Sequence, residues 1–111
     1  MNLDVQELGG GRATLRLEGR LDLVNAGALR EAVRGAVARG LHSLVVDLAD
    51  VPFVDSSGIG ALIGGLRETR QAGGELRIAN AAEQVRTVLS LTKIDRVLKP
   101  YESVDEALDG L

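Results

Sequence analysis

Hydrophobic and polar residues follow two different periods along this chain, and the change from one period to the other predicts strands and helices. In residues 12–18 apolar and polar side chains alternate, which is typical of a half-buried strand, and residues 3–8 precede this strand across a run of glycines. From Asn25 onward, apolar residues recur at the spacing of one helical face. We therefore expect a hairpin followed by a helix that Asn25 caps and Gly40 ends.

The middle of the chain continues with strands that are joined through helices. Residues 43–48 are apolar without alternation, which predicts a strand covered on both faces near the centre of a sheet. A second helical pattern covers residues 59–66 and ends near Gly73. Residues 74–79 then form a short predicted strand.

The C-terminal third contains the last predicted elements. Asn80 with Glu83 resembles a capping box that opens a third helix. A short strand is predicted around residues 97–98, and Ser103 with Glu106 is expected to open a last helix. The elements therefore follow the order β-β-α-β-α-β-α-β-α.

This order predicts an α/β fold in one domain that spans residues 1–111. Strands joined through helices pair in parallel with right-handed crossovers, whereas the opening hairpin adds an antiparallel pair. The expected architecture is a small mixed β-sheet flanked by about four helices.

Composition narrows the possible classes of function. The chain has 111 residues, a net charge of −3 and 2% aromatic residues, so it lacks the basic stripe and the stacking surfaces that nucleic-acid binding uses. It contains no cysteine, which excludes disulfides and thiolate metal sites. It shows neither a basic and apolar leader nor an apolar run long enough to span a membrane. We expect a cytoplasmic protein with no cofactor, no nucleic-acid partner and no membrane insertion.

The candidate chemistry lies in the stretch VPFVDSSGIGALIGGL at residues 51–66, where Ser56 and Ser57 stand between a strand and a helix. One serine can simply cap the helix. A nucleophile elbow requires a glycine two positions before the serine, where this chain has Val54, and the only histidine precedes the central strand. A dinucleotide fingerprint fails because Ile63 replaces its last glycine. The remaining alternative is an exposed hydroxyl that accepts a phosphate.

Three short motifs of the chain resemble a known family. They are GRLD at residues 19–22, VDSSGIGAL at residues 54–62 and GGEL at residues 73–76. In this order and spacing, they resemble the STAS domain of bacterial anti-sigma-factor antagonists, and the resemblance extends over essentially the whole chain. It implies one STAS domain over residues 1–111 and a regulatory binding protein that is not an enzyme.

The resemblance also implies a phosphorylation switch. The first serine of the Asp-Ser-Ser-Gly motif, which is Ser56 here, accepts a phosphate from an anti-sigma factor that is itself a serine kinase. The unphosphorylated protein binds that anti-sigma factor and frees a sigma factor, and the phosphorylated protein lets go until a serine phosphatase resets Ser56. The residues expected to contact the partner surround this serine: Asp22, Asp55, Ser57, Gly58, Ile59, Gly60 and Ala61.

By the same resemblance, Asp22 and Asp55 line the site and Gly58 keeps the turn open. We expect no metal there, because two carboxylates without a third ligand make a weak site. The small residues Gly58, Ala61 and Gly65 share one helical face. Such a face either lets a partner's backbone approach closely or lets the helix pack tightly on the sheet.

A second class of function stays open. The chain can be a structural STAS subunit, in a signalling scaffold or as the cytoplasmic component of a lipid-transport complex. Affinity capture distinguishes the two classes: a small ATP-binding, kinase-like partner supports the switch, and a transporter ATPase supports the structural subunit.

Overall fold

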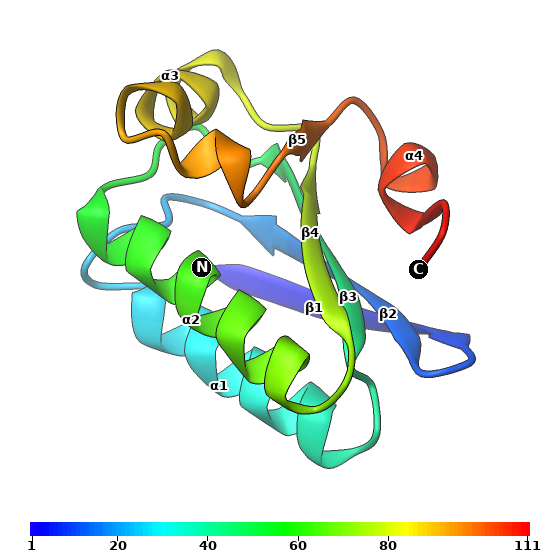
Figure 1. Ribbon diagram of the computed structural model, residues 1–111. Coiled ribbons are helices and arrows are strands. Elements are labelled where there is room, and N and C mark those ends of the chain that lie inside the picture. The colour runs from blue at the N-terminus through cyan, green and yellow to red at the C-terminus, as the bar shows by residue number, and fades with distance from the viewer.

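One sheet of five strands organises the fold, and its spatial order follows the order of the chain. In the computed structural model, which describes residues 1–111, the strands are β1 (Asn2–Gly9), β2 (Arg12–Glu18), β3 (Ser43–Asp50), β4 (Glu75–Ala79) and β5 (Pro100–Tyr101). Strand β1 is antiparallel to β2, and every other neighbouring pair is parallel (Figure 1). The predicted mixed sheet, with residues 43–48 in its central strand, is therefore confirmed.

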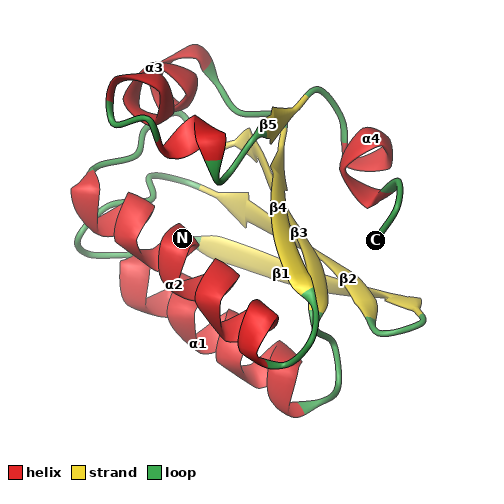
Figure 2. Cartoon of the chain, viewed as in Figure 1, coloured by secondary structure: helices red, strands yellow, loops and turns green.

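Helices cover both faces of this sheet. They are α1 (Ala26–Ala38), α2 (Ser56–Gln71), α3 (Glu83–Leu91) and α4 (Val104–Leu108), with a turn of 3-10 helix, η1 (Ile94–Arg96), after α3. Helices α1 and α2 lie side by side on one face, and α4 lies on the opposite face (Figure 2). None of these helices is both long enough and apolar enough to cross a membrane.

The two covered faces explain why β3 is apolar without alternation. Leu44, Val46 and Leu48 belong to the main hydrophobic core on the side of α1 and α2. Val45 belongs to a smaller cluster on the other side, where it meets Ala107 of α4. Strand β2, in contrast, buries only every second side chain, because its other face is open to solvent.

The predicted end of α1 is confirmed, but its predicted cap is wrong. Gly40 adopts the left-handed backbone conformation (φ +82°), and its N–H donates to the carbonyl of Val37. Asn25 occupies the N-cap position without capping the helix, because its side-chain amide donates to the carbonyl of Arg20 (2.8 Å). Asn25 therefore holds the segment before the helix in place.

The capping box predicted for α3 is also wrong. The N-cap of α3 is Ala82, which has no side-chain acceptor. Asn80 instead turns the chain out of β4 with φ +59°, a conformation that Asn tolerates better than most residues. Its side-chain amide donates to a carboxylate oxygen of Asp47 on β3 (3.1 Å). Asn80 thus fixes the chain where it leaves the C-terminal end of β4.

The strand predicted around residues 97–98 lies later in the chain. The structure forms η1 and then β5, whose residues pair with Ile78 and Ala79 of β4. Leu98 is buried (1% exposed) and fills the main core from an irregular segment. A short apolar run records burial but does not distinguish a strand from another buried conformation.

Candidate functional site

The turn between β3 and α2 leaves two serine hydroxyls free of structural hydrogen bonds. Ser56 is the first residue of α2 and is exposed, and Ser57 is half-buried. Asp55 is the N-cap of the helix, because its Oδ1 accepts a hydrogen bond from the N–H of Gly58 (2.9 Å). The alternative in which one of the serines caps α2 is therefore wrong.

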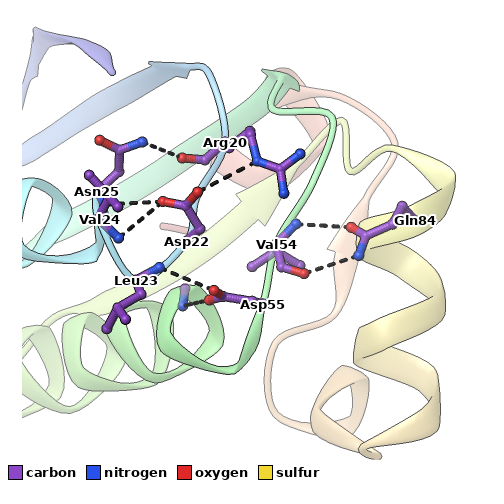
Figure 3. A network of polar contacts seen from close by, with 9 residues as sticks. Arg20, Asp22, Leu23, Val24, Asn25, Val54, Asp55 and Gln84 are labelled. Carbon is purple, nitrogen blue, oxygen red and sulfur yellow. Dashed lines mark hydrogen bonds and ion pairs between the residues drawn. The ribbon is translucent and has the colours of Figure 1, made fainter.

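The second carboxylate oxygen of Asp55 joins this turn to the loop that follows β2. It accepts a hydrogen bond from the N–H of Leu23 (3.1 Å; Figure 3). The backbone of Leu21 in the same loop pairs in parallel with Val54. Within the loop, Oδ1 of Asp22 accepts two backbone N–H groups at 3.2 Å each. The fold thus brings both carboxylates to the turn that carries the serines.

The hydrogen bonds to Asp55 also lower the pKa of its carboxyl group. The N–H of Gly58 makes the largest contribution; desolvation opposes it, and the N–H groups of Leu23 and Ser57 add to the lowering. Hydrogen bonds to a carboxylate favour its charged form. Asp55 therefore stays negatively charged beside the serines at neutral pH and well below it.

Gly58 allows the loop after β2 to lie directly against α2. A Cβ atom at this position would collide with the carbonyl oxygen of Leu21 and would lie 2.6 Å from Cγ2 of Val54. The φ angle of Gly58 is not in the left-handed region, so the turn itself does not require glycine. Gly58 therefore permits a close contact rather than keeping the turn open, which corrects the expected role.

The helical face with small residues packs inside the protein. Ala61 is fully buried, and a Cβ atom on Gly65 would lie 2.9 Å from Cδ1 of Leu76. Of the two explanations for this face, tight packing of the helix on the sheet is the one that the structure has. Ile59 is also buried (6% exposed), whereas Gly60 is exposed.

Two exposed hydrophobic residues at the site are absent from the predicted set. Leu23 and Val24 have 76% and 85% of their surface exposed, directly after Asp22. In the sequence they are adjacent apolar residues that fit neither the strand period before them nor the helical period after them, and that mismatch could have identified them. In the structure, the side chain of Leu23 points away from the hydrogen-bond network (Figure 3).

Side chains from other segments fix the position of the turn. Gln84 of α3 brackets Val54: it accepts from the N–H of Val54 (2.9 Å) and donates to its carbonyl (3.0 Å). The guanidinium of Arg20 lies over the ring of Phe53, 4.0 Å from its centroid. Sequence reasoning missed these residues because each acts on a segment that is distant in the chain. Together they present Ser56 on a well-supported turn.

The chemistry available at this turn is that of an exposed hydroxyl. His42 is the one histidine, and it lies before β3, whereas Ser56 follows the end of that strand. The chain contains no group of three or more His, Cys, Asp or Glu side chains that could hold a metal ion. What the arrangement provides is an exposed Ser56 hydroxyl at the start of α2.

Comparison with known proteins identifies relatives. The family model described as STAS domain matches residues 2–107. The anti-sigma F factor antagonist of Paenibacillus polymyxa is 28% identical over 113 residues, which cover 100% of this chain and 97% of that protein. A relative from Thermotoga maritima is 32% identical over 71 residues, which cover 64% of this chain and 63%, less than two thirds, of the relative. A crystal structure of an anti-sigma factor antagonist from Mycobacterium paratuberculosis superposes with a TM-score of 0.84 at 27% identity, covering 97% of this chain and 91% of that one.

Proposed function

The chain belongs to the STAS domain family, and we propose that it is an anti-sigma factor antagonist controlled by phosphorylation of Ser56. In the unphosphorylated state it binds an anti-sigma factor that is also a serine kinase, and a sigma factor is set free. Phosphorylation of Ser56 by that kinase releases the complex, and a serine phosphatase restores the binding form. The protein itself contributes a binding surface and a phosphate acceptor, with no catalytic residue of its own.

The proposal rests on one observation: the residue that caps α2, Asp55, is not the residue that would accept the phosphate, Ser56. Asp55 provides the cap of α2, so a phosphate on Ser56 removes no hydrogen bond that the helix needs. Ser56 is exposed, whereas Ser57 is half-buried, and a kinase reaches the first hydroxyl more easily. The turn can therefore change charge while the fold stays intact.

The size of the expected electrostatic repulsion supports release of the partner by the charge of the phosphate. A phosphoserine adds about −1.5 to −2 charges at neutral pH. A partner carboxylate about 4 Å away then meets a repulsion on the order of 4 kcal/mol per charge pair at an effective dielectric constant of about 20. Moving a partner from almost fully bound to almost fully free requires about 5.5 kcal/mol. Repulsion together with the bulk of the phosphate is sufficient, and a change of fold is not needed.

The exposed hydrophobic residues beside the switch supply part of the proposed contact. Leu23 and Val24 lie on the loop whose backbone Asp55 holds, so their position depends on the same turn that carries Ser56. Burial of apolar surface at the contact would stabilise the unphosphorylated complex. In this proposal the accessible residues Asp22, Ser57 and Gly60 contact the partner. The buried residues Gly58, Ile59 and Ala61 hold α2 in position.

The test begins with affinity capture from the native host and identification of the partner by mass. The purified partner is then incubated with ATP and the wild-type, Ser56→Ala and Ser57→Ala proteins, followed by phosphopeptide mapping. We expect labelling of wild type and Ser57→Ala at Ser56, and none of Ser56→Ala. Labelling confined to Ser57, or undiminished binding by the fully phosphorylated protein, would contradict the mechanism. Capture of a transporter ATPase would favour the structural subunit.

A further inference from the structure

A groove between α1 and α2 concentrates positive charge on a chain whose net charge is −3. Its volume is about 200 Å³. The lining consists of Arg30, Val33, Arg34, Gly64, Gly65, Arg67 and Glu68. Three arginines thus face one glutamate in a protein that is acidic as a whole.

The charge of this groove is only partly compensated within the chain. Arg34 forms an ion pair with Glu31 of the same helix (3.0 Å). Arg30 and Arg67 form no ion pair, although six other arginines of the chain do. Glu68 lines the groove, and no ion pair joins it to either of them. Two guanidinium groups therefore remain available to external anions.

Residues of α2 at intervals of four lead from Gly64, which lines the groove, back to Ser56. Residues 56, 60 and 64 are separated by four positions and lie on one side of the helix. Gly60 is exposed, and Nη2 of Arg30 lies 3.5 Å from the position that a Cβ atom on Gly60 would occupy. A Cβ atom on Gly64 would meet nothing within 4 Å, so packing within the chain does not explain this glycine. The surface is low enough for another chain to approach α2 closely.

We propose that this groove docks an acidic segment of the protein partner, whose carboxylates contact Arg30 and Arg67. The identity of that partner as an anti-sigma factor rests on the function proposed above, whereas the chemistry of the segment follows from the groove. The volume is below the roughly 300–1,000 Å³ of sites for small ligands. No aromatic side chain lines it for stacking on a base. Acidic side chains are the occupants that match its size and charge.

The location of the groove connects docking with release. An acidic segment that lies along Gly60 and Gly64 passes the side of α2 on which Ser56 begins the helix. A phosphate on Ser56 then adds negative charge about one helical turn from Gly60, where the guanidinium of Arg30 lies. Like charges repel across such a contact, so phosphorylation would loosen the segment without closing the groove.

Titration calorimetry with the captured anti-sigma factor tests the groove directly. Arg30→Gln/Arg67→Gln removes two positive charges from it. The control, Arg12→Glu, changes the net charge by the same amount at a site away from the groove. Arg12 lies on β2 beside Ser43 at the start of β3, whereas Ser56 follows the other end of β3. We expect about tenfold weaker binding for the double variant and less than about twofold for the control, with a difference that shrinks at high salt because charge contacts are screened. Equal affinities of the two variants would overturn the proposal while leaving the function of Ser56 intact.

A second measurement does not depend on the identity of the partner. A short poly-glutamate peptide is titrated into the isotope-labelled protein while its NMR spectrum is followed. Shifts centred on Arg30, Gly64 and Arg67 in wild type, absent in Arg30→Gln/Arg67→Gln, support the proposal even if no anti-sigma factor binds. Shifts spread over all arginines, no shifts, or the same pattern with inorganic phosphate alone would overturn it.

Discussion

Two helices of this protein begin beside a serine, and the two serines differ in what their hydroxyls do. Ser103 is the N-cap of α4, and its Oγ accepts the N–H of Glu106 (3.1 Å), as the sequence predicted. Ser56 lies one position inside α2, because Asp55 occupies the N-cap. A shift of one residue relative to the cap therefore decides whether a serine hydroxyl serves the fold or remains open to solvent.

This difference separates a structural serine from one that can be modified. A phosphate on Ser103 would replace a hydroxyl that holds the first turn of α4. A phosphate on Ser56 would leave the bond between Asp55 and Gly58 in place. A regulatory serine at a helix start is thus compatible with a stable fold when a neighbouring side chain supplies the cap.

The largest loss of stability is expected at Gly58, where the loop after β2 lies directly against the start of α2. In Gly58→Ala, the new Cβ would collide with the carbonyl of Leu21, which cannot move without disturbing its pairing with Val54. We expect the free energy of unfolding to fall by about 1–3 kcal/mol, measured by urea denaturation. The control is Gly64→Ala, which meets open space and should gain about 0.5–1 kcal/mol. Similar values for both variants would show that α2 does not need this close approach.

The next effect concerns the structural serine. Ser103→Ala removes the oxygen that caps α4 and should lower the free energy of unfolding by about 1 kcal/mol. Hydrogen exchange at the amide of Glu106 should become faster, because that N–H loses its acceptor. Unchanged exchange at this amide would mean that the serine does not cap α4 in solution.

Most of the fold could be predicted because burial and hydrophobic period agree there. Residues 43–48 read as a central strand because both faces of β3 are covered. The wrong predictions concern side chains whose contacts do not follow from the hydrophobic period. Asn80 bonds to Asp47 instead of capping a helix, and Leu98 fills the core without belonging to a strand.

The site could be predicted in outline but not in its details. The sequence contains Asp55, Ser56 and Ser57 in a row, and all three belong to residue types that favour the N-cap position. Their order alone cannot show which one caps the helix, because Asp55 is also held by the N–H of Leu23 in the loop after β2. That contact joins segments far apart in the chain.

A smaller effect is expected for the free serine. Ser56→Ala should change the free energy of unfolding by no more than about 0.5 kcal/mol, the usual range for an exposed side chain without structural bonds. The measurement is urea denaturation beside Ser103→Ala under identical conditions. A loss as large as that of Ser103→Ala would show that the Ser56 hydroxyl also stabilises its helix, and the comparison would fail.

The last prediction concerns the charge of the α2 cap, which Asp55→Asn removes. Asparagine keeps a side-chain oxygen that can accept the N–H of Gly58, so the helix start should persist. The pKa of Asp55 is lowered in the folded protein, first by the N–H of Gly58, and the ionised carboxylate therefore stabilises the folded state.

The sign of the pH dependence of Asp55→Asn follows from this lowered pKa. The extra stability of wild type is fully present above the unfolded pKa of about 3.9 and is lost as the pH falls through the lower pKa of the folded state. Urea denaturation from neutral to acidic pH should show the difference between wild type and Asp55→Asn shrinking only below about pH 4. Asp4→Asn, on the exposed strand β1, controls for the loss of one negative charge. A difference between wild type and Asp55→Asn that stays constant through the acidic range would mean that the carboxylate charge contributes nothing to the cap of α2.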